Sequence, residues 1–346
     1  MNDAAISSAP AISSAPAGSG SDDLMTLTRA RLVGVGTYLP ENLVTNDELA
    51  KTVDTSDEWI RERTGIRQRY LAATHETCAF MATRAAQAAL TNAGIAGSEI
   101  GVVILATATP DQAFPATATR VQAAIGAGGF AFDISAACSG FIYALGMADS
   151  LIRSGAVRTA LVIGAEVYSR ILDWNDRGTC VLFGDGAGAV VLRAAEGTDA
   201  APRILTTHLH SDGNLGDILY VDGAVGRRDR PGHLIMNGRE VFRHAVARMS
   251  EAIDEALAAN HLGRADIDWL IPHQANRRII DGIGKKLGLD ESHVVVTVDR
   301  HANTSAASIP LALAEAMLDG RIRPGQLILL VALGGGLTWA SALIRL

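Results

Sequence analysis

The sequence predicts an α/β fold made of two similar layered halves. Short apolar runs typical of buried strands alternate with longer segments of helical periodicity, as in layered α/β domains. Three features of the first half recur in the same order in the second, at offsets of 165 to 167 residues: the runs 104–107 and 270–273, the polar turns at Cys138 and Asn303, and the runs 160–163 and 327–330. We therefore expect an internal duplication, with mixed sheets between layers of helices.

Length and composition narrow the class of protein. A chain of 346 residues with 48% hydrophobic residues is long enough for one large core or two fused cores. A net charge of −7 with 5% aromatic residues, and no basic stripe, argues against a nucleic-acid partner. No apolar run reaches the roughly 20 residues of a membrane span, so we expect no membrane partner. Residues 1–28 are rich in Ala, Ser, Pro and Gly and contain no Lys or Arg, which predicts a disordered tail rather than a secretory signal.

Three scattered cysteines are too few for a disulfide framework or a zinc site. We therefore expect a protein of a reducing compartment, the cytoplasm, with free thiols and no bound metal.

The elements expected in the first half follow from periodicity and capping signals. A strand at 31–36 opens the folded part. Cap residues followed by acids predict helix starts at 46–48 and 55–58. Beyond them we expect a helix at 76–92 ending at Gly94, a strand at 102–106, a helix at 116–125, a strand at 129–134, a helix at 141–151, and strands at 159–163 and 181–192.

The second half begins less regularly. The Gly-, Asp- and Arg-rich stretch 211–232 predicts a surface excursion over a site. A long helix at 239–260 and strands at 270–273 and 327–330 should follow. We divide the chain into the tail 1–28, an N-terminal half 29–200 that carries Cys138, and a C-terminal half 201–346 that carries His273 and Asn303.

Cys138 is the candidate nucleophile. It lies where the strand 129–134 gives way to the helix 141–151, so free N–H groups and the helix dipole would stabilise a thiolate there. Its neighbours on both sides are Ala, Ser and Gly, which leave room for a bulky substrate. A lone cysteine is more often a small buried hydrophobe, so by itself this turn leaves both interpretations open. Cys78 and Cys180 have no polar cluster around them, and we assign them to the core.

Two polar clusters follow apolar runs in the second half. One begins at His273 and the other contains Asn303. A duplication brings equivalent loops together at a pseudo-twofold axis, and α/β sheets bind ligands at the carboxyl ends of their strands. We therefore expect Cys138, His273 and Asn303 in one pocket. A neutral imidazole and an amide both donate hydrogen bonds, and together they can hold an enolate or thioester oxygen.

These segments resemble the thiolase superfamily and, within it, the β-ketoacyl-acyl carrier protein synthase III family. The resemblance runs from about Leu32 to Leu346, and its motifs are 55–60, 63–66, 136–141, 176–179, 183–188, 273–276, 303–305 and 334–339. It implies a thiolase-like fold and the initiating decarboxylative Claisen condensation of bacterial type II fatty-acid synthesis. In that reaction a short acyl-CoA, expected to be acetyl-CoA, and malonyl-acyl carrier protein give 3-oxoacyl-acyl carrier protein, CoA and CO2, by a ping-pong route through an acyl-Cys138 intermediate.

The resemblance also implies a role for individual residues. Cys138 would carry the acyl group, its N–H and that of Gly335 would form the oxyanion hole, and His273 and Asn303 would stabilise the enolate. The other implied sites are Thr55, Trp59, Arg63 and Arg177 for CoA, Gln274, Arg277 and Arg278 for the carrier protein, and Phe114 for the acyl pocket of a second copy in a homodimer. No cofactor is implied, since acyl-CoA is a substrate.

One position departs from the family pattern. Where the family often has Asn, this chain has Arg239, which leaves the CoA contacts on that side open.

Alternative functions and structural interpretations remain open. The same fold serves condensing enzymes or acyltransferases of secondary metabolism with another starter or acceptor. A papain-like cysteine hydrolase also combines Cys, His and Asn, and a binding protein could retain the fold without catalysis. We interpret His301 as structural and 183–186 as a buried turn in which Asp185 caps backbone groups. The cluster Arg227, Arg228 and Arg230 is interpreted as a solvated loop.

Overall fold

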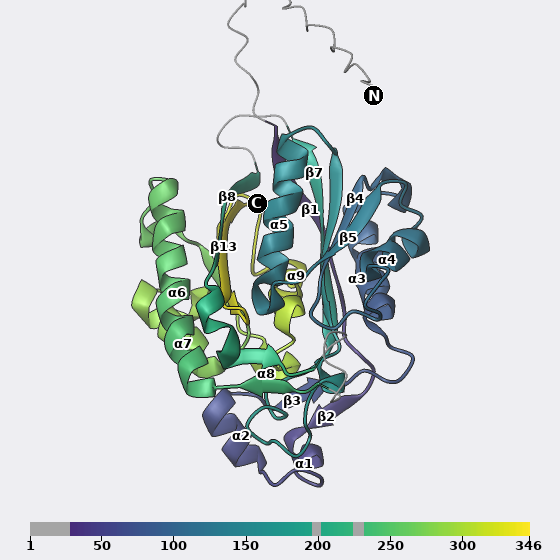
Figure 1. Cartoon of the computed structure of the whole chain (residues 1–346). Helices are drawn as coiled ribbons and strands as arrows, with labels where there is room; N and C mark the ends of the chain where they lie inside the picture. Colours follow the sequence, from purple (N-terminus) through teal and green to yellow (C-terminus); the bar gives the residue numbers. More distant parts are fainter. Residues whose placement is uncertain (1–27, 196–201, 224–231) are drawn as a thin grey trace, which may run out of the picture.

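The computed structural model describes residues 28–195, 202–223 and 232–346 (Figure 1). The tail expected at 1–28, apart from its last residue, and the cluster of Arg227, Arg228 and Arg230 lie outside these ranges. Within them, no helix combines the length and apolarity needed to cross a membrane.

The first of two mixed sheets has the strand order β1-β7-β6-β4-β5. Strand β4 pairs in parallel with β5 and β6, whereas β7 is antiparallel to both β6 and β1. These strands are β1 (Arg29–Tyr38), β4 (Val102–Ala106), β5 (Phe130–Ile134), β6 (Thr159–Glu166) and β7 (Gly186–Ala195).

The second sheet repeats this pattern with the order β11-β12-β13-β8. Strands β11 and β12 are parallel, and β13 is antiparallel to β12 and β8, as β7 is to β6 and β1. An isolated parallel bridge from Leu270 to Val294 stands where a fifth strand would pair. The strands are β8 (Arg203–Ser211), β11 (Trp269–Pro272), β12 (Leu327–Gly334) and β13 (Thr338–Arg345). The predicted α/β fold with mixed sheets is confirmed, while the domain limits at residues 29, 200 and 201 stay a prediction.

Helices form three layers around the two sheets (Figure 1). The side chains of β4 show why, because Val102, Ile104 and Ala106 join the core around α5 and α9, while Val103 and Leu105 join the core under α3 and α4. Helices α6 and α7 cover the outer face of the second sheet. These helices are α3 (Cys78–Ala93), α4 (Thr117–Ile125), α5 (Gly140–Arg153), α6 (Gly238–Ala259), α7 (Arg277–Leu287) and α9 (Ser308–Leu318).

Smaller elements gather at one end of the layers, the lower end in Figure 1. Capping fixes the start of one of them, because the Ser56 hydroxyl accepts a hydrogen bond from the Trp59 N–H. The elements are β2 (Leu43–Thr45), α1 (Asn46–Leu49), α2 (Asp57–Thr64), β3 (Gln68–Tyr70), β9 (Leu219–Val221), β10 (Leu234–Met236) and α8 (Val298–His301).

The expected strand 181–192 is correct only in its second part, since β7 begins at Gly186. Residues before it form a turn in which the buried Asp185 carboxylate accepts hydrogen bonds from the N–H groups of Ala72 and Ser169. The predicted capping role of Asp185 is therefore confirmed. The stretch 211–232 is less irregular than expected, because it contains the short strand β9.

Glycine allows the closest contact between a helix and the first sheet. A Cβ at Gly36 in β1 would lie 2.2 Å from the backbone nitrogen of Ala89 in α3 and 2.4 Å from the carbonyl oxygen of Ala85. Any side chain at this position therefore forces the helix away from the sheet.

We predict that Gly36→Ala lowers the free energy of unfolding by about 3 kcal/mol, because backbone atoms cannot yield as a side chain can. Chemical denaturation of the purified variant measures this loss. The matched control is Gly128→Ala, since an added Cβ at this exposed loop position meets no atom within 4 Å. Equal stability of the two variants would contradict the close packing of α3 on β1.

Candidate active site

Cys138 lies in a turn at the start of the central helix α5. The turn is a short 3-10 helix, η2 (Ala137–Ser139), that runs directly into Gly140. Its first residue, Ala137, has a φ of 45°, a left-handed conformation that side chains rarely adopt and that often marks functional sites. A Cβ at Gly334 would lie 2.6 Å from the Cys138 nitrogen, so the end of β12 rests directly on this turn. Cys138 is consequently only 5% exposed.

His273 directly follows β11 and is held at two points. Its backbone N–H donates to the carbonyl of Val331 (2.8 Å), and its Nδ1 lies 2.7 Å from the hydroxyl oxygen of Ser308. That hydroxyl also accepts the N–H of Gln274 (3.3 Å), and it can donate its own hydrogen to Nδ1. This arrangement suits the tautomer with hydrogen on Nε2. Burial lowers the pKa of His273 to about 3, so the ring is a neutral donor.

Asn303 occupies the equivalent turn of the second half. It follows Ala302, whose φ is 58°, and its backbone bonds to Leu182 (2.9 Å) and Gly184 (3.1 Å) across the pseudo-twofold axis. The side-chain Oδ1 accepts the N–H of Ser305 at 2.9 Å. Because this contact occupies the oxygen, the amide is oriented with its Nδ2 donors available to the cavity.

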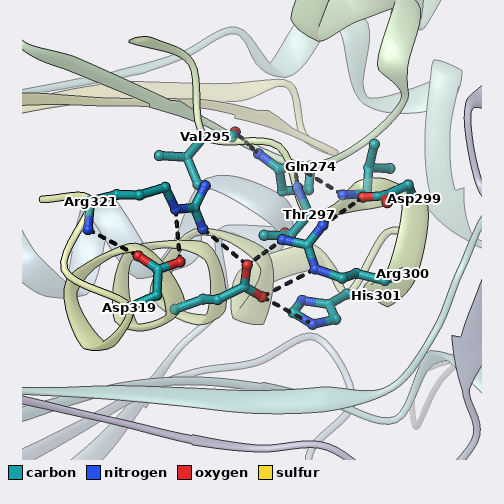
Figure 2. A network of polar contacts seen from close by, with 10 residues as sticks. Gln274, Val295, Thr297, Asp299, Arg300, His301, Asp319 and Arg321 are labelled. Carbon is teal, nitrogen blue, oxygen red and sulfur yellow. Dashed lines mark hydrogen bonds and ion pairs between the residues drawn. The ribbon is translucent and has the colours of Figure 1, made fainter. Parts of the chain in front are cut away.

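A network of polar contacts holds residues 299–301 against helix α9 (Figure 2). The Glu315 carboxylate in α9 accepts from Arg300 and Arg321 and lies 3.6 Å from Nε2 of His301. His301 is buried in this network, which agrees with its interpretation as a structural residue.

Gln274 ties the two chemistry-bearing segments together. Its side-chain nitrogen donates to the carbonyls of Pro272 (2.7 Å) and Val295 (3.1 Å), and its oxygen accepts the N–H groups of Thr297 and Val298. The residue is fully buried. The expected contact of Gln274 with a carrier protein is therefore corrected, since every polar atom of the side chain is engaged inside the protein.

One cavity of about 680 Å³ brings the three candidate residues together. Cys138, His273 and Asn303 all line it, and a largely apolar wall surrounds them. Other lining residues are Trp59, Arg63, Tyr168, Phe183, Leu219, Met236, Arg239, Phe242, Asn276, Arg278 and Leu333.

The residues expected to bind CoA also lie close together. The guanidinium groups of Arg63 and Arg177 lie 4.6 Å and 5.2 Å from the ring centre of Trp59. Arg177 is held by the backbone carbonyl of Asp54 at 2.9 Å. The hydroxyl of Thr55 is buried and has no hydrogen-bond partner among the described residues, and Thr55 does not line the cavity. Arg239 lines the same cavity.

The remaining candidates lie in different surroundings. Arg278 is exposed and donates to the carbonyl of Glu62, whereas Arg277 is paired with Asp281 (2.6 Å) and Glu291 (3.2 Å). Phe114 is 85% exposed. The oxyanion role of Gly335 stays a prediction.

The protonation state of the Cys138 thiol differs from the thiolate expected from the sequence. Burial raises the pKa of Cys138 to about 12, and the opposing hydrogen bond with the Ser305 hydroxyl does not offset this. The helix N-terminus was expected to stabilise a thiolate, but the loss of solvent has the larger effect. The resting nucleophile is therefore a thiol, which must lose its proton when it attacks.

Four polar residues near the trio were not predicted from the sequence. The Ser308 hydroxyl contacts Nδ1 of His273, and the N–H of Ser305 orients Asn303. Glu166 and Tyr168 both contact the Ser305 hydroxyl at 3.1 Å. The only signal in the sequence was a single carboxylate, Glu166, at the end of the apolar run 160–165.

Comparisons with known proteins agree on one family. The family model for 3-oxoacyl-acyl-carrier-protein (ACP) synthase III matches residues 132–213, and the model for its C-terminal part matches residues 257–346. The chain is similar to the beta-ketoacyl-acyl-carrier-protein synthase III of Acidiphilium cryptum (strain JF-5), with 67% identity over 320 residues, covering 92% of this chain and 100% of the relative.

Comparisons with solved structures agree with this family match. The structure of 3-oxoacyl-acyl-carrier-protein synthase III from Aquifex aeolicus VF5 gives a TM-score of 0.86 at 48% identity, over 92% of this chain and 100% of that one. The priming beta-ketosynthase from the R1128 polyketide biosynthetic pathway gives a TM-score of 0.86 at 36% identity, over 92% and 96% of the two chains.

The geometry at His273 predicts its protonation state. NMR of protein labelled with 15N in its imidazole rings should show a neutral Nε2–H tautomer from about pH 8 down to about pH 5, because the pKa lies near 3. A His273→Gln variant assigns the signal. In Ser308→Ala the ring should shift toward a mixture of tautomers. Titration of His273 near its ordinary pKa, or an Nδ1–H tautomer, would contradict the role of His273 as an Nε2–H donor.

Proposed function

The chain belongs to the 3-oxoacyl-acyl-carrier-protein synthase III family, and from this we propose that it performs the initiating condensation of fatty-acid synthesis. It is an acyltransferase that joins a short acyl-CoA, for which acetyl-CoA is our choice, to malonyl-acyl carrier protein. The products are 3-oxoacyl-acyl carrier protein, CoA and CO2.

The observation that carries this proposal is the meeting of Cys138, His273 and Asn303 on one cavity. A thiol can hold the acyl group, which divides acyl transfer into two easier steps. Two neutral donors opposite the thiol suit an enolate that forms next to it. This is the combination that a decarboxylative condensation requires.

In the first half-reaction, Cys138 attacks the thioester carbonyl of acyl-CoA and CoA leaves. The N–H groups of Cys138 and Gly335 are our candidates for the donors to the developing oxyanion. Close packing of Gly334 against the Cys138 nitrogen supports this assignment, because it places the 334–336 segment beside the turn.

In the second half-reaction, His273 and Asn303 hold the thioester oxygen of malonyl-acyl carrier protein. Loss of CO2 leaves an enolate, whose charge the Nε2–H and Nδ2–H groups stabilise. Neither donor changes its charge, since the pKa of His273 lies far below neutral pH. The enolate carbon then attacks the acyl group on Cys138.

We propose that CoA enters past Trp59, whose ring lies between the arginines 63 and 177. Guanidinium groups suit both the phosphates and the stacked adenine of CoA. We keep Thr55 as a candidate CoA contact because of its place in the 55–60 motif that contains Trp59.

The partners of the enzyme follow from its surface. The exposed Arg278 at the cavity, with Arg277 beside it, supports docking of an acidic carrier protein there. Phe114, exposed over 85% of its surface, supports a homodimer in which it enters the partner's acyl pocket.

All three cysteines are free, which suits the cytoplasm. The chemistry assigned to Cys138, His273 and Asn303 calls for no cofactor.

A second candidate is a related condensation in secondary metabolism. The similarity to a priming beta-ketosynthase of a polyketide pathway favours keeping it, because the fold does not separate the two: both solved structures give a TM-score of 0.86. A panel of acyl-CoA starters and acceptors distinguishes them, since only the fatty-acid enzyme should prefer malonyl-acyl carrier protein.

A papain-like hydrolase does not fit the site. There the Asn orients the catalytic His, which must accept a proton. Here Ser308 holds Nδ1 of His273, and the Asn303 oxygen is engaged by Ser305. The intact trio likewise speaks against a binding protein without activity.

We predict that the two halves of the reaction separate by mutation. Cys138→Ala should abolish condensation while leaving decarboxylation of malonyl-acyl carrier protein measurable, because the donor pair is intact. Asn303→Ala should still form acyl-Cys138 by intact mass, with decarboxylation lowered about 100- to 1,000-fold by the lost donor. Failure of the native protein to form an acyl-Cys138 adduct with any short acyl-CoA would rule out the proposed function.

Trp59→Ala should raise the KM for acyl-CoA about tenfold, because an aromatic surface for the adenine is lost, and stacking of a base on an aromatic ring contributes about 1–3 kcal/mol. Steady-state kinetics with acyl-CoA and with the matching acyl-pantetheine measures this. The short thioester lacks the nucleotide, so its KM should not change. An equal loss with both substrates would place CoA elsewhere.

A further inference from the structure

Glu166 is a buried carboxyl group for which the proposed reaction has so far no use. It ends strand β6 and is fully buried. Its oxygens accept hydrogen bonds from the hydroxyl groups of Thr107 (3.2 Å) and Thr109 (2.6 Å) and from the backbone N–H of Ala108. Three such donors can hold a carboxylate inside a protein.

The fourth donor to Glu166 leads to the nucleophile. The hydroxyl of Ser305 lies 3.1 Å from Oε1 of Glu166, and it is near enough to the Cys138 thiol to act on the pKa of that thiol, which it lowers. A Cβ at Gly164 would lie 2.2 Å from the carbonyl oxygen of Ala306, so β6 and the turn η7 (Ser305–Ala307) are in direct contact. The Ser305 hydroxyl is therefore placed to connect the surroundings of the sulfur with one carboxylate.

The other titratable groups that face the path from Cys138 through Ser305 to Glu166 cannot take up a proton at neutral pH. The pKa of His273 is lowered to about 3 by burial. Tyr168, at the same serine hydroxyl, and Cys78, next to Thr107, have pKa values raised by burial and hold their protons. Burial raises the pKa of Glu166 to about 7, against its hydrogen bonds. Among the described residues around the sulfur, Glu166 is the group that changes charge near neutrality.

We propose that Glu166 is the base of the acylation step, accepting the thiol proton of Cys138 through the hydroxyl of Ser305. The inference rests on the proposed function, because it concerns how acyl-Cys138 forms. It assigns a task to a residue that lies outside the cavity and touches no substrate.

The proton count balances over the two half-reactions. During acylation the bond from Sγ to the acyl carbon forms, the bond from that carbon to the CoA sulfur breaks, and the thiol proton moves to Ser305 as the serine proton moves to Glu166. The CoA thiolate takes a proton from solvent. During condensation the carbon–carbon bond forms, the Sγ–carbon bond breaks, and the Cys138 thiolate receives a proton from neutral Glu166 by the reverse route. One solvent proton is consumed per turnover, as loss of CO2 from a carboxylate requires.

The test measures acylation and decarboxylation separately. Single-turnover acylation of Cys138 by acetyl-CoA, followed by intact mass, should slow by about 100- to 10,000-fold in Glu166→Gln, the usual contribution of a general base. Decarboxylation of malonyl-acyl carrier protein should change little, because it uses His273 and Asn303. In the native protein acylation should rise with pH through about 7, where Glu166 ionises, and Glu166→Gln should lose this rise.

Ser305→Ala is the matched variant if Glu166→Gln does not fold. It removes the relaying hydroxyl but keeps the backbone N–H that orients Asn303. Acylation should slow while decarboxylation persists. A third variant, Thr109→Val, removes a donor to the carboxylate and should shift the midpoint of the acylation profile to higher pH.

Each outcome is decisive. Native-like acylation rates and pH profiles in both Glu166→Gln and Ser305→Ala would overturn the inference, and so would an equal loss of acylation and decarboxylation, which indicates a structural role. Neither result would contradict the proposed function as long as the native protein forms acyl-Cys138. Absence of that adduct in the native protein would instead remove the proposed function itself.

Discussion

The site depends on the close packing of two turns, one from each half of the molecule. The turn that carries Asn303 lies on the end of β6, and the end of β12 lies on the turn that carries Cys138. Gly164 and Gly334 make both contacts possible, since a Cβ at either position would overlap backbone atoms of the opposite turn. The same approach brings the Asn303 backbone into hydrogen bonds with Leu182 and Gly184. The arrangement of the site residues therefore depends on how the two sheets pack against each other.

Burial produced by this packing sets the protonation states of Cys138 and His273. A charge that loses water must be paired or neutralised, so the thiol stays protonated and the imidazole stays neutral. The imidazole is then a good donor but a poor base. A nucleophile that keeps its proton needs an acceptor, and Glu166 has one hydroxyl between itself and the sulfur. Acylation and enolate stabilisation thus use different parts of one dry pocket.

The sequence contained enough to bring the trio together but not enough to describe its electrostatics. Cys138, His273 and Asn303 were predicted to meet because each follows a strand-like run in a duplicated pattern. The prediction of a thiolate at Cys138 was wrong, because the depth of burial depends on contacts with residues such as Gly334 that are distant in sequence. Gln274 stands within a polar motif and looks exposed in the sequence, yet it is buried as a cross-link. Glu166 ends an apolar strand and meets a serine 139 residues away, a contact that no local pattern reveals.

Time-resolved infrared difference spectroscopy of the acylation step tests the central claim, that burial leaves Glu166 and not His273 to take the proton. At about pH 8, above the pKa of Glu166, the carboxylate is ionised before acyl-CoA is added. We predict that a protonated carboxyl band appears at the rate of acyl-Cys138 formation. Imidazolium bands appearing in its place would contradict this description of the site.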